Sequence, residues 1–577
     1  MTLFSSKIPR NNSSLVRAHS RGSFSRLVLE SESSNGEYAT SIPFFLCQMI
    51  VITFRSVTPI SYLGLLAYFF LPVTPGHFGG PFQGQLAYWT CFAFMTAEAL
   101  FFPVYLYMFT AMNQRNVELR HVARCTDSRM QLVEKCFNAM ACAGKEGSLM
   151  DRSPERYLRK VLEGWHFDTP IGQIRRDNFG QWAAWAFWDK DLEDLLTSER
   201  KELNNIISFV EEKVDWKFEE GMNKRITSAR LTLDPVFATQ RPFFFYVTIW
   251  LVNTICHLFL YFILGFRLEP EHCSDGQSIY RRIGTGTMST GKRRRLPVFV
   301  IHGLGIGYTH YLNVLARLPR DVDVYLLEWP HVCMQLTTKV PKMEETIRIV
   351  NSVLDAHGHE AACFLAHSLG TTVVSWMLHD EVGKNKVAAT VLLDPVTFLL
   401  CDPTVATNVV YKPPSNTIDF LMHFFIAREL FISNALSRHF NWSHNIMFVE
   451  ELFQNKSTGP DGVNMSPRTR FKKGVGGGLR KTLDSNSADT YMSCSSGSHD
   501  GDDARPPRVN HSIILSSNDS IVPVGPVSRY LHQKSEEYSG SNKKPNFEVA
   551  MFHGYHGEMM LRPSWAKRIA GMVDSKL

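Results

Sequence analysis

Apolar residues are distributed differently in the two halves of the chain. Long uninterrupted apolar stretches occupy the first half, at residues 42–71, 86–112 and 243–266. Each is long enough to cross a bilayer, which takes about 20 helical residues. After residue 278 the apolar runs become short, and several end at glycine-containing turns, as buried strands do. The pattern therefore predicts membrane-associated helices first and buried strands afterwards.

The first two apolar stretches predict a transmembrane hairpin over residues 41–113. The link between them, residues 72–85, contains no Lys or Arg, whereas basic residues precede and follow the hairpin. Short loops rich in Lys and Arg stay on the cytoplasmic side of a membrane. Both ends of the hairpin, and with them the N-terminus, are therefore predicted to be cytoplasmic. The basic residues concerned are Lys7, Arg10, Arg17, Arg21, Arg26, Arg115, Arg120, Arg124 and Arg129.

Two charges lie inside the predicted hairpin, Arg55 in its first helix and Glu98 in its second. Counted from the same membrane surface they lie at similar depths, so one hypothesis is that they pair and lower the cost of burying both charges. The alternative is that Pro59 breaks the first span and that the Arg55 side chain reaches the interface.

The remaining N-terminal segments are assigned by composition. Residues 1–40 are rich in Ser, Asn and Arg without the apolar core of a signal peptide, and we expect a disordered basic arm. Residues 114–242 are charged and helix-patterned, which predicts a cytoplasmic helical region. The third apolar helix, at 243–267, either spans the membrane or is interfacial or buried. Basic residues flank it on both sides and leave these alternatives open.

The strongest chemical signal is Ser368. A buried apolar run at 363–367 breaks at a small-x-Ser-x-Gly turn, and a helix-like stretch follows at 372–379. A strand, a sharp turn and a helix in that order expose a serine at the tip of a sheet as a nucleophile. Ala366 and Gly370 are small enough to let the strand and helix backbones approach closely.

A glycine-containing loop follows the apolar strand at 296–301 and is the predicted oxyanion loop. Glycines let the loop fold tightly, so that a backbone N–H points at a developing oxyanion. We predict the N–H groups of Leu304 and Leu369 as the two donors. The residues that support this arrangement are His302, Gly303, Gly305, His367 and Gly370.

An acid and a base follow later in the chain. The apolar strand at 512–515 leads into Asp519, which is favoured as the acid that orients a histidine. Asp394, also at a strand end, is the alternative acid. The last strand, 547–552, is followed by two candidate bases, and His556 is favoured over His553 because it lies nearer the terminal helix.

The order Ser, Asp, His is that of α/β-hydrolases, and residues 278–577 resemble that superfamily. A narrower resemblance is to a membrane-associated hydrolase family common in fungi and other microbial eukaryotes. The resemblance implies an α/β fold of the α/β-hydrolase type and supports Ser368, Asp519 and His556 as the triad, but implies no substrate. The segments similar to the narrower family are 165–167, 231–235, 325–332, 394–396 and 438–442.

A long insertion separates the Asp394 strand from the Asp519 strand. Its first part, about 397–455, is apolar and helix-like and resembles the helical cap of α/β-hydrolases. This cap is either a lid that favours substrates with a hydrophobic acyl chain or a subdomain packed in a fixed position. The second part, about 455–508, is rich in Ser, Gly and charged residues and is predicted to be disordered.

Composition excludes several classes of function. A net charge of +6 over 577 residues gives no reason to expect a nucleic-acid partner, and eleven scattered cysteines without a CxxC pair argue against a disulfide framework. His357 and His359 have no further ligand at a spacing that closes a metal site. We expect neither a metal nor an organic cofactor.

Together these features predict a membrane-anchored serine hydrolase, esterase- or lipase-like, that acts on a hydrophobic or lipid ester. An acyltransferase that uses the same acyl-enzyme is one alternative. A non-catalytic membrane scaffold with a hydrolase fold is an alternative of another class. We expect an integral protein of an intracellular membrane, with the endoplasmic reticulum or a lipid-handling organelle favoured over the plasma membrane. Its expected partners are membrane lipid and the ester substrate, and the oligomeric state stays open.

Overall fold

The computed structural model describes residues 42–71, 73–79, 81–114, 128–144, 154–274, 276–288, 295–414, 416–453, 510–540 and 547–577. The arm predicted at 1–40 and the insertion predicted at about 455–508 lie outside the described residues. Two compact units divide the chain. The first consists of Met1–Phe137, Gly147–Phe243 and Asp402–Phe440, and the second of Asn138–Glu146, Phe244–Cys401 and Asn441–Leu577.

The second unit contains an eight-stranded mixed sheet in the order β1-β2-β4-β3-β5-β6-β7-β8. β2 is antiparallel to both of its neighbours, and β4 through β8 run parallel. The strands predicted near Ser368, Asp519 and His556 are present as β5, β7 and β8. The strands are β1 (Arg267–Leu268), β2 (Ser278–Arg282), β3 (Val298–Ile301), β4 (Val324–Glu328), β5 (Ala362–His367), β6 (Val387–Leu393), β7 (His511–Ser516) and β8 (Phe547–Phe552).

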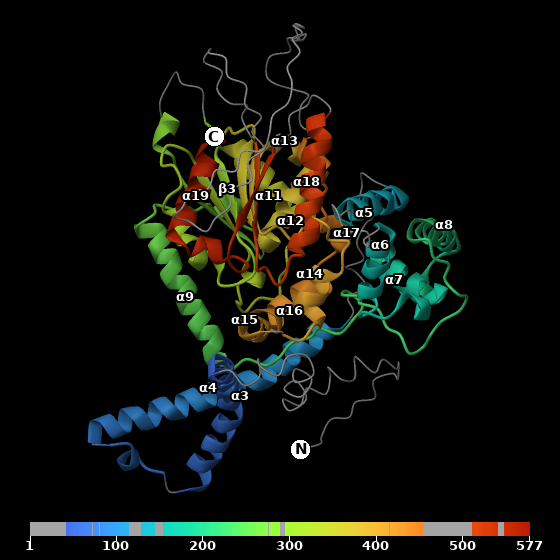
Figure 1. The fold of residues 1–577 in the computed structure, drawn as a ribbon. Helices are drawn as coiled ribbons and strands as arrows, with labels where there is room; N and C mark the ends of the chain where they lie inside the picture. The colour runs from blue at the N-terminus through green and yellow to red at the C-terminus, as the bar shows by residue number, and fades with distance from the viewer. Residues whose placement is uncertain are drawn as a thin grey trace. The chain divides into compact units, whose positions relative to one another are not determined.

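Helices cover both faces of the sheet, with α19 on one side of β3 and α11 and α12 on the other (Figure 1). β3, β4 and β5 are buried at every position, as expected for strands covered on both faces. Val298 and Val300 share a core with α19, whereas Phe299 stacks between Tyr325 and Phe364 on the opposite face. The helices of this unit are α9 (Phe243–Phe262), α10 (Leu312–Leu315), α11 (Met343–Ala356), α12 (Thr371–His379), α13 (Gly383–Lys386), α17 (Trp442–Asn445), α18 (Val524–Gly540) and α19 (Pro563–Asp574).

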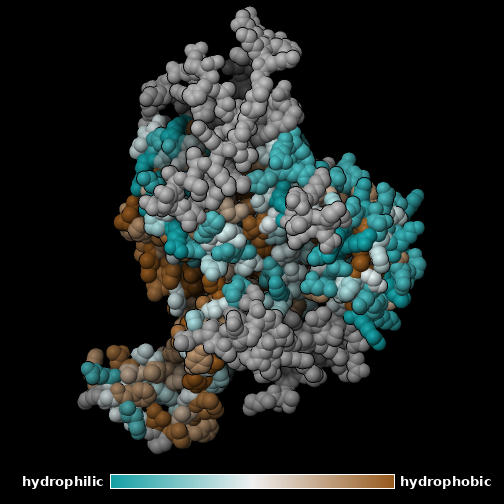
Figure 2. Space-filling view, in the orientation of Figure 1, coloured by the Kyte–Doolittle hydropathy of each residue, from teal (hydrophilic) through white to brown (hydrophobic). Residues whose placement is uncertain are grey.

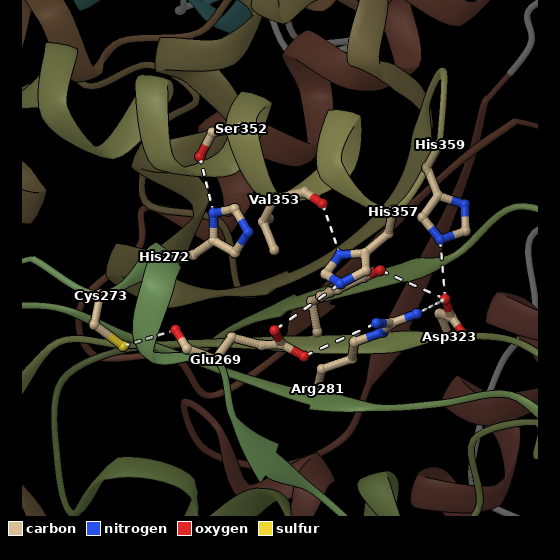
Figure 3. Close-up of polar contacts among 10 residues, drawn as sticks. Glu269, His272, Cys273, Arg281, Asp323, Ser352, Val353, His357 and His359 are labelled. Carbon is tan, nitrogen blue, oxygen red and sulfur yellow. Dashed lines mark hydrogen bonds and ion pairs between the residues drawn. The ribbon is translucent and has the colours of Figure 1, made fainter.

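A polar network connects β2 with the residues just before β4 (Figure 3). The buried carboxylate of Asp323 accepts hydrogen bonds from Arg281 at 2.9 Å and from the Gly284 N–H at 2.8 Å, and contacts His359 Nε2 at 3.0 Å. His357 lies 3.9 Å from Glu269 instead. The two histidines considered as metal ligands in the sequence therefore contact different carboxylates.

Replacing Asp323 with Ala is expected to lower the free energy of unfolding of this domain by about 3–5 kcal/mol, because Arg281 then keeps a charge whose closest partner is gone. Urea titration of the detergent-purified protein measures this. The matched control is Glu381→Ala, which removes a pair with Lys384 from a carboxylate 77% exposed. That change is expected to cost less than about 1 kcal/mol. Equal shifts for the two variants would contradict the role given to Asp323.

The first unit contains two long apolar helices, α3 (Ile42–Phe70) and α4 (Pro81–Asn113). They contact each other, and the Tyr62 hydroxyl donates to the Ala99 carbonyl at 2.8 Å. Among the described residues, three helices are long and apolar enough to cross a membrane, namely Pro43–Phe70, Phe82–Asn113 and Phe243–Phe262. All three predicted apolar stretches are therefore helical and are candidate spans.

The alternative in which Pro59 breaks the first stretch is wrong, since α3 continues through this proline. The charged residues of the two helices have other contacts. Glu98 accepts a hydrogen bond from the Phe243 N–H at 2.7 Å, and the Arg55 guanidinium lies 5.6 Å from the centre of the Phe424 ring. Pairing of Arg55 with Glu98 stays a prediction.

The segment Asp402–Phe440, most of the predicted cap, belongs to the same unit as α3 and α4. Phe44 and Phe54 of α3 contact Phe420 and Phe425 of this segment. Arg438 donates to the Thr232 carbonyl at 3.1 Å, so two segments that carried the narrower resemblance meet here. The remaining helices are α5 (Arg129–Gly144), α6 (Pro154–Trp165), α7 (Arg176–Trp188), α8 (Thr197–Val214), α14 (Thr404–Ala406), α15 (Thr417–Met422) and α16 (Leu430–Arg438).

Candidate active site

Ser368 lies on the sharp turn between β5 and α12. Its backbone has φ +51°, a left-handed conformation that a non-glycine residue adopts only when its surroundings enforce it. A Cβ at Gly370 would lie 2.6 Å from the His302 carbonyl oxygen, and one at Gly303 would lie 2.8 Å from Ser368 Cβ. These glycines therefore let the oxyanion loop approach the serine turn.

The structure brings Ser368, His556 and Asp519 together from three different strand ends. His556 Nε2 is 2.8 Å from Ser368 Oγ, and His556 Nδ1 is 2.6 Å from Asp519 Oδ2. The other oxygen of Asp519 accepts the N–H groups of Ile521 and Val522 at 2.8 and 2.9 Å. A carboxylate held in this way accepts a hydrogen bond from the Nδ1–H group, which leaves the Nε2 lone pair facing the serine hydroxyl.

The charge environment of His556 makes it a strong base. Burial by itself lowers the pKa of this imidazole, but the carboxylate of Asp519, helped by that of Asp394, outweighs burial and raises the pKa to about 9. An anionic neighbour stabilises the imidazolium that forms when the serine gives up its proton.

Asp394, the alternative acid, lies beside this group with a different set of contacts. Its carboxylate accepts from the Ser516 N–H at 2.7 Å, from the Ser516 hydroxyl at 2.8 Å and from the Gly557 N–H at 2.8 Å. Burial raises the pKa of Asp394 to about 6, against the opposing effect of His556. Through these hydrogen bonds Asp394 connects the end of β7 to the loop that carries His556. The alternative base His553 is exposed, and no hydrogen bond of its ring is found within the described part of the chain.

Asp394, Asp519 and His556 also have ligand atoms within 4.8 Å of one another, the spacing of a possible metal site. However, backbone N–H groups and the serine hydroxyls already engage these atoms. Hydrogen bonding explains the cluster, so the donor set does not fit a metal. The expected absence of a cofactor stays a prediction.

One N–H group of the oxyanion loop, that of Leu304, lies between two that are already engaged. Gly303 donates to the Tyr311 hydroxyl at 2.8 Å, and Gly305 donates to the Val332 carbonyl at 3.1 Å. Between them, the Leu304 N–H has no acceptor among the described residues. Leu369 follows Ser368 at the start of a helical segment, where the first N–H groups have no partner within the helix.

Two buried histidines hold the loops in place. His302 Nδ1 donates to the Gly303 carbonyl at 2.8 Å, and its Nε2 accepts from the Trp329 N–H at 3.1 Å. His367 Nδ1 contacts the Tyr311 hydroxyl at 2.7 Å. Burial lowers the pKa of both imidazoles, which keeps them neutral. Tyr311 and Trp329 were not recognised from the sequence, because only the folded loop places them beside these histidines.

Replacing Gly303 with Ala is expected to lower kcat/KM by about 10²-fold, because the added Cβ displaces the serine turn or the oxyanion loop and catalysis is sensitive to shifts of about 1 Å. Ester hydrolysis measures this. The matched control is Gly571→Ala in α19, where a Cβ meets nothing within 4 Å. The control is expected to keep full activity and to be slightly more stable. Unchanged kinetics of the Gly303 variant would contradict this packing.

Comparison with known proteins agrees with this topology. Residues 297–563 match the family described as alpha/beta hydrolase fold. This domain has the alpha/beta hydrolase fold. The match supports the predicted superfamily for this region of the chain, and the narrower membrane-associated family stays a prediction. No curated protein matches the sequence.

Solved structures similar to this chain have low sequence identity. A bacterial membrane phospholipase A has a TM-score of 0.32 and 12% identity, over 57% of this chain and 93% of that chain. Carboxylesterase CesB of Bacillus subtilis has a TM-score of 0.31 and 8% identity, over 56% and 95%. The naproxen esterase of Bacillus subtilis has a TM-score of 0.31 and 11% identity, over 56% and 94%. Scores this low carry no weight in the choice of substrate.

Proposed function

We propose that the protein is a membrane-anchored serine hydrolase that cleaves a hydrophobic or lipid ester. The observation that carries the proposal is the pair of contacts that joins Ser368 to His556 at 2.8 Å and His556 to Asp519 at 2.6 Å. A hydroxyl, a base and an orienting acid in hydrogen-bonding sequence are what nucleophilic acyl transfer needs. The strained backbone of Ser368 is further support, because such strain is concentrated at functional sites.

Each residue then has a defined role. Ser368 Oγ attacks the ester carbonyl carbon while His556 Nε2 takes the hydroxyl proton, and Asp519 stabilises the resulting imidazolium. The Leu304 and Leu369 N–H groups donate to the oxyanion. Collapse of the tetrahedral intermediate transfers the proton from His556 to the leaving alcohol and leaves an acyl-enzyme. Water, deprotonated by the same histidine, releases the carboxylic acid and restores Ser368.

The apolar helices support the membrane part of the proposal. In this view α3 and α4 form a hairpin through the bilayer, with the N-terminus in the cytoplasm because basic residues flank the hairpin and are missing from its connecting link. We propose an intracellular membrane as its location. An enzyme anchored in this way meets substrates that partition into the bilayer, which favours a lipid ester.

A fluorophosphonate probe tests the proposed chemistry, because it reacts only with activated serines. Membranes containing the wild-type protein are expected to be labelled on this chain, and membranes containing Ser368→Ala are not. His553→Ala is the matched control and is expected to be labelled normally, since His553 is exposed beside the same loop. Absence of labelling in folded wild-type protein would contradict an activated nucleophile and would favour a scaffold.

A further inference from the structure

Helix α9 has one buried face and one exposed face. One face is buried and consists of Phe245, Tyr246, Ile249, Asn253, Cys256 and Leu260. The other face is exposed, and its large residues are apolar: Val247, Trp250, Leu251, Ile255, Leu258, Phe259, Tyr261 and Phe262. Monomeric soluble proteins rarely expose a continuous apolar stripe of this length. The exposed face of α9 therefore needs a partner.

The buried face is part of the hydrolase domain itself. Cys256 and Leu260, with Leu264 just after the helix, belong to the same core as β3, β4 and α19. His257 Nε2 contacts Glu328 Oε1 at 3.0 Å, at the end of β4. The His257 ring also stacks on Tyr280 of β2, with 5.2 Å between ring centres. The C-terminal part of the helix, from Cys256 onward, is thus attached to the hydrolase domain.

The exposed face has the chemistry of a lipid contact. Residues 243–266 contain no Asp, Glu, Lys or Arg. The hydroxyls of Thr248 and Thr254 donate to the Phe244 and Trp250 carbonyls, at 2.9 and 2.8 Å, within the helix. A helix face that contacts water or another protein normally carries some charged side chains. A face that contacts lipid instead needs its polar groups to form hydrogen bonds within the helix. Figure 2 shows the hydrophobic surface that α9 forms on this side of the domain.

The end of the helix has the residues of a membrane interface. Arg267 is exposed, donates to the Tyr261 and Phe266 carbonyls at 2.7 and 2.9 Å, and lies 3.6 Å from the centre of the Tyr261 ring. Aromatic rings and arginines are enriched at headgroup level. Arg267 also supplies positive charge that complements anionic lipid headgroups.

We propose that α9 lies along the cytoplasmic surface of the bilayer, with its exposed face in the lipid, and does not cross the membrane. If α9 crossed, the end of β4 with the buried Glu328 would have to follow it into hydrocarbon, where charged groups are costly. An interfacial helix needs an apolar face in the lipid and a polar covering above it, and here the hydrolase domain supplies that covering.

The third apolar stretch is then interfacial, which is one of the alternatives that the sequence left open. If α9 does not cross, residues 114–242 and the hydrolase domain lie on the same side of the membrane. The choice of the cytoplasmic side rests on the proposed orientation of the hairpin, whereas the contact of α9 with lipid does not depend on the proposed catalytic activity.

Topology mapping tests whether α9 crosses. A short tag carrying a glycosylation sequon is placed either after Glu220, in the exposed segment before α9, or after Leu577, and both full-length proteins are inserted into sealed microsomes. We expect the two tags to behave alike, without glycans and with digestion by added protease. A glycosylated, protected tag at one position and a digested tag at the other would show that α9 crosses and would overturn the proposal.

Lipid contact is tested separately with a photoactivatable phosphatidylcholine, in vesicles that contain the full-length protein. Crosslinks are expected on the exposed face between Val247 and Phe262, at a level comparable to that on α3 and α4, which serve as internal controls. The exposed positions of α11 should stay unlabelled. Labelling of α3 and α4 without labelling of α9 would mean that protein covers this face and would overturn the proposal. We expect the same tag topology and the same lipid crosslinks in the Ser368→Ala variant, because neither measurement depends on catalytic activity.

Discussion

Replacing Ser368 or His556 with Ala is expected to lower kcat by about 10⁴- to 10⁶-fold. Each variant removes one partner of the 2.8 Å contact between His556 Nε2 and Ser368 Oγ. Without the imidazole the serine hydroxyl keeps its proton, and without the hydroxyl no acyl-enzyme forms. Residual catalysis comes from substrate binding and the oxyanion donors, which both variants retain. Ester hydrolysis by the detergent-solubilised protein measures the loss.

The double variant sharpens this prediction. Because Ser368 and His556 act as one unit, Ser368→Ala with His556→Ala is expected to be about as inactive as either single variant. His553→Ala is the control, and it is expected to retain wild-type kcat because its ring is exposed and no hydrogen bond joins it to Ser368 in the described residues. A double variant whose loss equals the product of the two single losses would mean that the residues act independently. That result would contradict the triad.

The core of the site could be predicted from the sequence because its signals are local. The turn around Ser368, the glycine loop at 302–307 and the loop after the last strand each follow an apolar run that is recognisable without a fold. Parallel strands end at the same edge of a sheet, so these loops meet. The order of β3, β5, β7 and β8 in the sheet agrees with this reasoning.

The choice between two acids needed the fold. Asp394 and Asp519 both follow strands, and those strands, β6 and β7, are neighbours in the sheet. The sequence favours Asp519, which lies before the last strand, and leaves Asp394 as the alternative. Only the folded loop shows that Asp519 contacts His556 Nδ1, whereas Asp394 accepts from Ser516 and Gly557. The partners of the oxyanion loop, Tyr311 and Trp329, likewise lack any local signal.

The hydropathy of the sequence predicts the third apolar helix but does not show which of its faces is buried. Asn253 and His257 are the only strongly polar side chains in α9, and both lie toward the hydrolase domain, where Asn253 is buried and His257 contacts Glu328. Two strongly polar residues among 20 leave the mean hydropathy of the helix high, so its sequence resembles that of a spanning helix. The difference between a helix that crosses and one that lies on the surface arises from tertiary packing.

Asp519→Asn is expected to lower kcat by about 10⁴-fold, and Asp394→Asn by about 10- to 10²-fold. Asn at 519 presents an amide to His556 Nδ1 and favours the tautomer whose Nε2 carries the proton, so the base no longer accepts from Ser368. At 394 the acceptors for Ser516 and Gly557 are weakened, which shifts the loop of His556 without removing its acid. A larger loss at 394 than at 519 would make Asp394 the acid.

The dependence of kcat/KM on pH also distinguishes the role of Asp394 from that of Asp519. His556 must be neutral to act as a base, and its pKa of about 9 predicts that kcat/KM rises with pH until the imidazole is deprotonated. The negative charge of Asp394 favours the imidazolium, so Asp394→Asn is expected to lower this pKa and move the rise toward lower pH. Asp394→Glu, which retains the charge, should leave the rise nearer its original position even if kcat falls. A profile that does not move in Asp394→Asn would mean that Asp394 has only a structural role and that Asp519 alone sets the basicity of His556.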